Sequence, residues 1–300
     1  MTKPNLRSLN KMDFTKVVPT RNQKISDAPA KSLPPLSSYK ANEIAAALHP
    51  KNQKLKVAKI IEQSSDVKSF ILVADVESGT QSLAYFSAGQ YLSITLNIGS
   101  SVITRPYSLS SSPKESLIGE YMLTVKRTGG GLASNYILDS WQVGTKVMAS
   151  APLGDFTYEP LRDAKQIIGL AGGSGITPFY SLAKAIADGD EDACLTLLYG
   201  SCTKADAIFQ AEFEALAASC DRFRVINVLS EEPAEGCEQG FLTAELIRKY
   251  APESGDYSIF ICGPQAMYNF VDKEIATLGL RKKFIRHELF GEYRHPERDA

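Results

Sequence analysis

Residue types able to hold a flat ligand that carries phosphate gather in the run Arg105-Pro106-Tyr107-Ser108-Leu109-Ser110. An arginine guanidinium matches a pyrophosphate because its planar fork donates two parallel hydrogen bonds. Successive strand residues point to opposite faces, so Tyr107 and Ser108 can offer a ring and a hydroxyl to different parts of a ligand. The run therefore favours a flavin site. Alone, it is more often the start of an edge strand, where proline is tolerated.

Two glycine-rich runs follow, and each precedes a predicted helix: Gly129-Gly130-Gly131-Leu132-Ala133-Ser134-Asn135 and Gly172-Gly173-Ser174-Gly175-Ile176-Thr177-Pro178. Free backbone N–H groups at a helix start bind phosphate, and glycine lets the backbone approach it closely. In the second run Thr177 is a good N-cap and Pro178 a good first helical residue. The two runs predict two nucleotide sites, although a triple glycine also makes plain flexible turns.

Composition excludes several other classes of protein. The 300 residues are 44% hydrophobic and 22% charged, as in ordinary globular domains, and the formal net charge is -1. No excess of basic residues attracts nucleic acid, and no apolar run is long enough for a membrane span, so a cytoplasmic location is expected. The five cysteines form no C-x-x-C pair and only three histidines are present, so no metal site is expected.

Two common catalytic motifs are also missing. Ile176 follows Gly172-Gly173-Ser174-Gly175 where a nucleophile elbow needs glycine, and no Gly-Lys-Ser/Thr run makes a P-loop. Neither an esterase-type triad nor a nucleotide triphosphatase loop is therefore expected.

The pattern of apolar residues divides the chain into four parts. Residues 1–53 are rich in proline and polar residues and predict a largely irregular extension with one short helix at 41–48. Residues 54–155 hold six short strand-like runs, which predict a small antiparallel barrel. Residues 160–293 alternate strands and helices, which predicts a doubly wound parallel sheet of five strands. Residues 294–300 read as a tail or linker. The predicted fold class is thus α+β with two domains.

Parallel strands place their carboxyl ends along one edge of a sheet, and ligands bind there. The five predicted strands of the second domain end at Ala171, Tyr199, Leu229, Cys262 and Leu289. We expect these ends to converge on one crevice.

From about residue 54 to 293 the chain resembles the ferredoxin-NADP reductase family, which pairs an FAD-binding barrel with a nicotinamide-binding α/β domain. Four motifs carry the resemblance, in the family's order and spacing: Arg105–Ser110, Thr124-Val125-Lys126-Arg127 with Gly131-Leu132-Ala133-Ser134, Gly173–Pro178, and Cys262-Gly263-Pro264. The cofactors implied are FAD and, as co-substrate, NADH or NADPH.

The resemblance also implies roles for single residues. Arg105 and Ser134 would hold the FAD pyrophosphate, Tyr107 would pack on the isoalloxazine ring, and Ser108 would lie near flavin N5. Thr177 and the loop glycines would hold the dinucleotide, and Cys262 would face the nicotinamide. The remaining cofactor-binding candidates are Pro106, Leu109, Thr124, Val125, Lys126, Gly131, Leu132, Ala133, Gly173, Gly175, Gly263 and Pro264.

Two further residues, Glu288 and Phe290, resemble the acid and the aromatic that family members carry near the flavin. Ser108, Cys262 and Glu288 are the candidate catalytic residues. A small thiol at a strand end is more often packing than chemistry, and Phe290 could equally be a core residue.

Coenzyme choice is indicated by Ser230-Glu231-Glu232, where family members that use NADP place Ser-Arg. A carboxylate about 4 Å from a phosphate costs ~4 kcal/mol at an effective dielectric constant of about 20. Cys202 also stands where many relatives carry arginine. These differences favour NADH, although Lys204, Arg222 and Arg224 could restore NADPH use.

The predicted function is an FAD-dependent oxidoreductase that passes hydride from NADH or NADPH to flavin N5. Single electrons would then go to an iron-sulfur, ferredoxin-like or flavodoxin-type protein. No cysteine follows Cys262, so a [2Fe-2S] partner would be a separate protein or a domain fused beyond residue 300. A reductase of free flavin and a non-catalytic module that binds both nucleotides are the alternatives.

Overall fold

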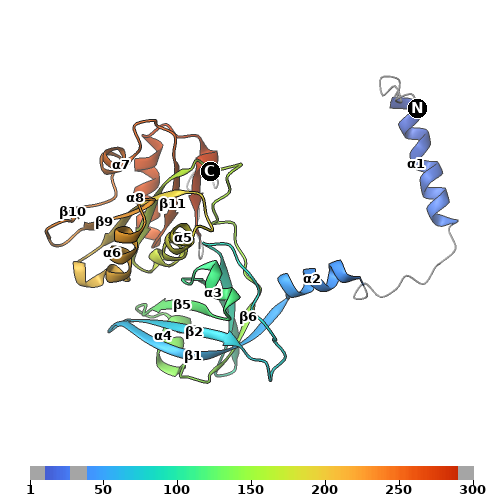
Figure 1. Cartoon of the computed structure of the whole chain (residues 1–300), viewed down its shortest axis with the longest axis horizontal. Coiled ribbons are helices and arrows are strands. Elements are labelled where there is room, and N and C mark those ends of the chain that lie inside the picture. The colour runs from blue at the N-terminus through green and yellow to red at the C-terminus, as the bar shows by residue number, and fades with distance from the viewer. Residues whose placement is uncertain (1–10, 28–38, 290–300) are drawn as a thin grey trace. The chain divides into compact units, whose positions relative to one another are not determined.

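The structure, a computed structural model, describes residues 11–27 and 39–289 (Figure 1). It divides into two units, Met1–Ala45 and Ala46–Ala300. The first contains helix α1 (Lys11–Ser26) and the start of helix α2 (Lys40–Leu48). The prediction of a single short helix before residue 53 was wrong, because the structure has both α1 and α2 there. The prolines were expected to exclude a helix, but α1 contains Pro19 in its interior. One proline removes one helical hydrogen bond, and the Lys, Arg and Gln around it are good helix formers.

The first half of the larger unit is an antiparallel sheet of six strands, which confirms the predicted barrel. In sheet order they are β4 (Ser101–Ser108), β3 (Tyr91–Ile98), β6 (Lys146–Ser150), β1 (Asn52–Ser64), β2 (Val67–Ala74) and β5 (Tyr121–Lys126). A bridge between Leu109 and Leu123 brings the two edges of the sheet together beyond the end of β4. Both predicted flavin motifs therefore lie where the two edges of the sheet meet.

Two helices accompany the barrel, α3 (Pro113–Leu117) and α4 (Leu132–Ser140). Ser112 is the N-cap of α3, and Glu115 completes a capping box with it. The α4 helix follows the triple glycine, as predicted. Trp141 ends α4 as its C-cap, and its ring contacts that of Phe70 of β2 edge-to-face at 5.3 Å between centroids.

The second half is a parallel sheet in the order β10-β9-β8-β7-β11-β12. Its strands are β7 (Gln166–Gly172), β8 (Cys194–Ser201), β9 (Phe223–Leu229), β10 (Glu238–Gln239), β11 (Ser258–Cys262) and β12 (Ile285–His287). The prediction of five strands missed β10. Two residues are too few for a hydrophobic period, so β10 is visible only through its pairing with β9.

Helices cover both faces of this sheet (Figure 1). One core joins it to α5 (Thr177–Asp188) and α6 (Gln210–Ser219), and the other joins it to α7 (Ala244–Tyr250) and α8 (Gln265–Ala276). Because both faces are covered, β7 is buried along nearly its whole length, as its continuous apolar run predicts. Three short 3-10 turns complete the domain: η3 (Gly173–Ile176), η4 (Lys204–Asp206) and η5 (Lys282–Phe284).

The barrel and the parallel sheet share part of their core. Val67 and Met122 of the barrel and Phe156 of the connecting segment belong to the same buried cluster as Phe179 of α5. Phe156 contacts Phe179 at 5.6 Å and Phe260 at 5.2 Å between ring centroids. The two halves therefore pack against each other through aromatic side chains.

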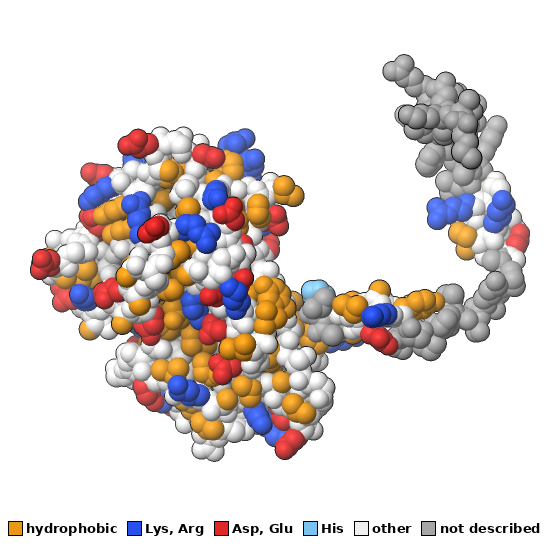
Figure 2. Space-filling view, in the orientation of Figure 1, with side chains coloured by type: hydrophobic (Ala, Val, Ile, Leu, Met, Phe, Trp, Pro, Cys, Tyr) orange, Lys and Arg blue, Asp and Glu red, His pale blue; other side chains and the backbone are white. Residues whose placement is uncertain are grey.

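The surface of the larger unit mixes acidic and basic side chains on the face that Figure 2 shows. This agrees with the near-zero net charge of the chain. Within the described residues, none of the helices is both long and apolar enough to cross a membrane.

Candidate functional site

The carboxyl edge of the parallel sheet opens into a pocket of about 580 Å³. Its walls come from the residues that follow β7, β8, β9 and β11, so four of the five predicted strand ends meet there; Leu289 is not among the lining residues. The lining includes Gly173, Gly200, Ser201, Ser230 and Pro264. This is where an open α/β sheet binds its ligand.

The glycine loop after β7 lies directly against the Cys262-Gly263-Pro264 turn. A Cβ atom added at Gly175 would lie 2.2 Å from the carbonyl oxygen of Cys262. One at Gly172 would lie 2.6 Å from the sulfur of Met267, which follows the turn on α8. Two motifs about 90 residues apart in the sequence thus pack backbone to backbone, and the close approach requires glycine.

Thr177 does not cap α5, contrary to the prediction. The 3-10 turn η3 lies between β7 and α5, so Ile176 is the N-cap and Thr177 is the first helical residue. The Thr177 hydroxyl donates to the carbonyl of Ser174 at 3.0 Å. This bond ties the first residue of α5 to the glycine loop, and Gly172 and Gly173 of the loop line the pocket.

Ser108 is the residue of the flavin motif whose environment most clearly calls for a ligand. Its side chain is 5% exposed at the end of β4, and its Oγ has no hydrogen-bond partner in the described part of the chain. Two residues further on, the Ser110 hydroxyl donates to the Met122 carbonyl at 3.1 Å, and its Oγ lies 2.9 Å from Oγ1 of Thr124. Buried hydroxyls are nearly always paired, so Ser108 fits a group that supplies its missing partner.

Arg105 and Tyr107 stand beside Ser108 on the same edge strand. The Arg105 side chain is exposed, and its Nη1 donates to the Thr104 carbonyl at 2.8 Å. The Tyr107 ring packs against the barrel core, and burial raises the pKa of its hydroxyl to about 12. Pro106 is tolerated because β4 is an edge strand of the described sheet and pairs with β3, as the edge-strand interpretation of Arg-Pro-Tyr predicts.

The start of α4 supplies backbone donors near this strand. Gly131 is the N-cap, and no side chain among the described residues bonds to the first-turn N–H groups. A Cβ at Gly131 would lie 2.7 Å from Ser134 Oγ, so the turn is tight. Leu132 is exposed and Ala133 is buried in the barrel core. An exposed arginine, open helix amides and an orphaned hydroxyl together fit the pyrophosphate and ring of FAD.

The second flavin motif splits into three different environments. Thr124 is buried and bonds Ser69 at 2.8 Å, and Val125 belongs to the barrel core. Lys126, in contrast, lines the pocket of the parallel sheet and lies 3.6 Å from Asp66. The barrel thus contributes a cation to the opposite domain's pocket, although the sequence motif placed Lys126 with the flavin.

Cys262 and Glu288 lie at the ends of neighbouring strands, and both are buried. Burial raises the pKa of the Cys262 thiol, so the sulfur keeps its proton. Burial, with Asp155 nearby, raises the pKa of the Glu288 carboxyl to about 8. Both candidate catalytic groups are therefore protonated at neutral pH, and Glu288 can donate a hydrogen bond.

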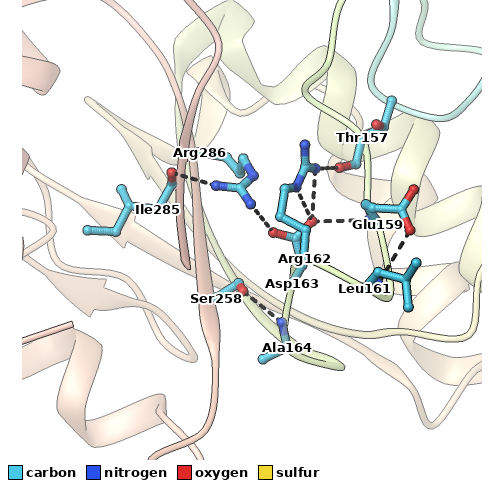
Figure 3. Close-up of polar contacts among 9 residues, drawn as sticks. All are labelled: Thr157, Glu159, Leu161, Arg162, Asp163, Ala164, Ser258, Ile285 and Arg286. Atoms are coloured by element: carbon cyan, nitrogen blue, oxygen red, sulfur yellow. Dashed lines mark hydrogen bonds and ion pairs between the residues drawn. The ribbon is translucent and has the colours of Figure 1, made fainter. Parts of the chain in front are cut away.

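The short strand that leads to Glu288 is fixed by a buried ion pair, which Figure 3 shows. Arg286 of β12 lies 2.7 Å from the fully buried carboxylate of Asp163, which also accepts a bond from Arg162 at 2.9 Å. Asp163 also accepts from the Glu159 N–H at 3.0 Å. Sequence reasoning missed this group, because its members are scattered and form no motif.

The carboxyl edge of the parallel sheet carries more negative charge than the sequence indicated. Asp206 lines the pocket and is fixed by Thr203, whose hydroxyl donates to it at 2.7 Å and holds the pKa of this carboxyl below its usual range. Glu231 is exposed beside Ser230, and Glu232 accepts a bond from the N–H of Lys204 at 2.7 Å. Sequence reasoning missed Asp206, because it lies in η4, beyond the end of β8, and outside the motifs that predicted the site.

Two arginines that could have restored NADPH use lie elsewhere. Arg222 donates to the carbonyls of Glu191 and Ile186, and Arg224 to that of Tyr250. They precede the pocket residue Val228 by six and four strand positions, so they lie about 20 and 13 Å from it. Of the three cations proposed, Lys204 alone stays at the carboxyl edge.

Two exposed aromatic rings at the pocket were also missed. Phe241 and Phe270 line it and contact each other at 5.8 Å between centroids. Their side chains are 65% and 37% exposed, which is unusual for phenylalanine in a folded domain. Phe290 lies outside the described residues.

Two family models match the chain. The oxidoreductase FAD-binding domain matches residues 54–158 and the oxidoreductase NAD-binding domain matches residues 170–273. The chain belongs to the ferredoxin-NADP reductase-like family. Its FAD-binding and NAD-binding domains are thus identified, in the predicted order.

Individual relatives agree with this assignment. The chain is 28% identical to a glycine betaine monooxygenase reductase subunit of Chromohalobacter salexigens, over 79% of this chain and 64% of that one. It is 29% identical to NADH-cytochrome b5 reductase 1 of Dictyostelium discoideum, over 82% and 85%. Among solved structures, the flavohem-like FAD/NAD-binding domain of nitric oxide dioxygenase from Vibrio cholerae has a TM-score of 0.70 at 26% identity, covering 80% and 99%. The matched region spans less than two thirds of the monooxygenase reductase subunit.

Proposed function

We propose that this protein is a flavin-dependent oxidoreductase that passes electrons from NADH, or less efficiently NADPH, to an electron-carrying protein. The observation that carries the proposal is the orphaned hydroxyl of Ser108, buried on the strand edge that the exposed Arg105 also occupies. When bound, FAD would accept a hydride from the nicotinamide and release electrons one at a time.

On the flavin side, the residues bind and orient. Arg105 and the open amides at Gly131–Ser134 would hold the pyrophosphate, as cations and helix starts do. Tyr107 would pack its ring on the flavin, and Ser108 would donate a hydrogen bond to the ring edge. Because Ser108 is already desolvated, such a bond involves no further loss of water from its hydroxyl.

On the coenzyme side, the residues hold the dinucleotide and exclude water. The loop at Gly173–Thr177 and the turn at Gly263-Pro264 form one wall of the pocket and Lys126 contributes positive charge for phosphate. Phe241 and Phe270 offer ring faces for the adenine. Cys262 and Glu288, both buried and protonated, would face the reacting rings without adding charge.

Coenzyme preference follows from the charges at the carboxyl edge. Ser230 and Asp206 line the pocket, and the exposed Glu231 follows Ser230 directly, so a 2'-phosphate bound here would bring a second negative charge beside acidic side chains. The free ribose hydroxyls of NADH can instead donate to a carboxylate. NADH is therefore the proposed coenzyme.

The acceptor is proposed by class alone. One relative is named as the reductase subunit of a monooxygenase and another as a reductase of cytochrome b5, so the names point to protein acceptors of one electron. A ferredoxin-like protein, a [2Fe-2S] domain or a flavodoxin fits this description.

The test is an anaerobic stopped-flow experiment on the purified chain, first with NADH and then with NADPH. Fast bleaching of a flavin that copurifies with the chain, faster with NADH, is the expected result. Reoxidation of the reduced protein by a [2Fe-2S] ferredoxin or flavodoxin, but not by added FMN, then identifies the acceptor class. Little retained flavin with activity that saturates in FMN would instead support a free-flavin reductase. A bound flavin that neither coenzyme reduces would overturn the proposal.

A further inference from the structure

A single buried carboxylate joins the segment between the two domains to the last strand of the parallel sheet (Figure 3). The Asp163 side chain is fully buried, and its two oxygens face different partners. Oδ2 accepts hydrogen bonds from the Glu159 N–H at 3.0 Å and from Arg162 Nη2 at 2.9 Å, both within the connecting segment. Oδ1 lies 2.7 Å from Nη2 of Arg286 on β12, whose side chain is 14% exposed. Asp163 therefore holds one arginine of its own segment and one of the distant strand.

Arg286 lies on the same face of β12 as the candidate acid Glu288. Glu288 follows the strand directly, and its N–H still donates to the Ile261 carbonyl at 3.0 Å, so the alternation of the strand continues to it. Residues two apart share a face and lie about 7 Å from each other along the strand. Arg286 is paired with Phe260 of β11, whose ring contacts that of Phe156 in the connecting segment. The ion pair therefore ties this face of β12 to the connecting segment, one strand repeat before Glu288.

β12 is a strand that depends on such a tie. It is three residues long, lies at the edge of the sheet beside β11, and all three of its residues are partly exposed. On its other face His287 lies 2.8 Å from Asp272 of α8. Short edge elements with little buried surface open locally at low cost in free energy. We therefore expect the end of β12 to open more often when the ion pair of Arg286 is lost.

The two arginines around Asp163 differ in what they hold. Removing one partner of a buried ion pair is severe when the other charge is left bare. Without Arg286, the Asp163 carboxylate keeps Arg162 and the Glu159 N–H, so the loss falls on β12. Without Arg162, the carboxylate keeps Arg286, and β12 stays attached to the connecting segment. The chain thus offers a matched pair of variants around one carboxylate.

We propose that Arg286 is a positioning residue for the reduction step: its ion pair with Asp163 holds the end of β12, so that the Glu288 carboxyl stays buried where the nicotinamide and the flavin would meet. The inference deepens the function proposed above and rests on it. Arg286 is assigned no contact with either nucleotide and acts through the strand that leads to Glu288.

The test compares Arg286→Met with Arg162→Met, each of which removes one guanidinium from Asp163 and keeps an unbranched side chain. In the flavin-loaded protein we expect the limiting rate of flavin reduction by NADH to fall about tenfold in Arg286→Met. The NADH dissociation constant should stay unchanged, because the residues proposed to hold the dinucleotide follow other strands. Arg162→Met should match the wild type in both quantities.

A second readout follows the Glu288 carboxyl itself and needs no turnover. The C=O band of its protonated form is isolated as the infrared difference between each protein and the same protein carrying Glu288→Gln, and its loss is followed as pH rises. If the strand end opens in Arg286→Met, water reaches the carboxyl and the band should disappear at lower pH than in the wild type. Arg162→Met should leave this titration unchanged.

The direction of the shift separates positioning from a simple effect of charge. The charged and titratable side chains around Glu288 are those of Asp155 in the connecting segment, Cys262 on β11, Tyr268 on α8 and Arg286 on its own strand. Removing the positive charge of Arg286 alone would disfavour the Glu288 carboxylate and move the loss of the band to higher pH. Loss of position predicts a move to lower pH.

The outcomes separate the two proposals. A wild-type protein that neither coenzyme reduces would overturn the proposed function, while the infrared titration would still test what Arg286 holds. An Arg286→Met variant with the wild-type reduction rate, with an unshifted titration or with a shift to higher pH would overturn the positioning role, as would equal changes in Arg162→Met. If Arg286→Met does not fold, Arg286→Lys decides, because it keeps the charge and loses the reach of the guanidinium. Its titration should move to lower pH, and an unshifted one would overturn the role.

Discussion

Glycine stands at the start of both proposed phosphate-binding turns, but the two turns need it for different reasons. At Gly131, a Cβ would meet Ser134 Oγ at 2.7 Å and Thr128 Cβ at 2.9 Å, on an exposed turn. At Gly175, a Cβ would meet the backbone carbonyl oxygen of Cys262 at 2.2 Å. At Gly131 the Ser134 hydroxyl can rotate away and the exposed turn can shift away from Thr128, whereas the buried strand end at Cys262 cannot move.

The comparison shows that a glycine motif can serve the fold and the ligand to different degrees. On the coenzyme side, glycine lets two sections of this chain touch, and the pocket forms as a result. On the flavin side, the first-turn amides of α4 have no side-chain partner among the described residues. We therefore expect Gly131 to serve a ligand more than Gly175 does, because backbone packing already requires Gly175.

The largest effect is expected from Gly175→Ala. Because the added methyl group clashes with the Cys262–Gly263 backbone, we expect a loss of about 3 kcal/mol in the free energy of unfolding, measured by urea denaturation of the apoprotein. Gly131→Ala should stay within about 1 kcal/mol of the wild type and instead weaken FAD binding in a titration. Equal stability losses in the two variants would remove the distinction between the turns.

Ser108 and Ser110 sharpen the comparison on the flavin side. Ser110 is satisfied by Met122 and Thr124, whereas Ser108 has a buried hydroxyl without a described partner. Ser110→Ala should destabilise the apoprotein by about 1 kcal/mol, and Ser108→Ala should leave it unchanged or stabilise it. With FAD bound, Ser108→Ala should slow reduction by NADH about 10-fold to 100-fold, since it removes a hydrogen bond at the reacting ring.

These two measurements act as controls for each other. Urea denaturation of the apoproteins gives the stability and stopped-flow absorbance gives the reduction rate. If Ser108→Ala reduces stability as Ser110→Ala does, its hydroxyl has a partner within the protein. The case for a flavin at this edge would then lose its main observation.

Much of the fold was readable from the sequence, because long strands and helices carry a clear hydrophobic period. β7 is a continuous apolar run from Gln166, and the closing strand β4 ends within its flavin motif, as predicted. β10 and α1 were missed for opposite reasons. A two-residue strand has no period, and the prolines of the first residues were given too much weight.

The site was readable as far as its residues are contiguous. Arg105, Ser108, Gly175 and Cys262 lie in short motifs whose chemistry can be argued locally. The ion pair of Asp163 with Arg286 joins residues that are 123 positions apart and that the fold brings together from different elements. Such contacts have no local pattern, which is also why the exposed ring of Phe241 was missed.

Glu231 tests the coenzyme side with a smaller expected effect. Glu231→Arg replaces a negative charge by a positive one at the carboxyl edge, so the kcat/KM for NADPH relative to NADH should rise about tenfold. Glu235→Arg, which changes an exposed acid four residues further from Ser230 along the same loop, is the matched control. A wild-type enzyme that already prefers NADPH would show that Lys126 or Lys204 outweighs the acids.

A pH-dependent effect is expected from Glu288, on the same coenzyme side. Its pKa is about 8 in the folded protein against 4.5 in the unfolded chain, so between about pH 5 and pH 8 the folded state binds more protons than the unfolded state. Stability should therefore fall as pH rises, by about 1 kcal/mol per pH unit within this window. Glu288→Gln, which keeps the shape and cannot ionise, should remove that part of the slope.

The measurement is urea denaturation of both apoproteins at several pH values, with the difference between them plotted against pH. Asp155 provides the check, because burial and then the charge of Asp155 raise the pKa of Glu288. Asp155→Asn should lower the folded-state pKa of Glu288 and bring the upper end of the window to lower pH, while the lower end, set by the unfolded chain, stays near pH 5. Parallel curves for the wild type and Glu288→Gln would mean that Glu288 ionises normally, and the coenzyme side would then carry a buried negative charge where we expect a neutral acid.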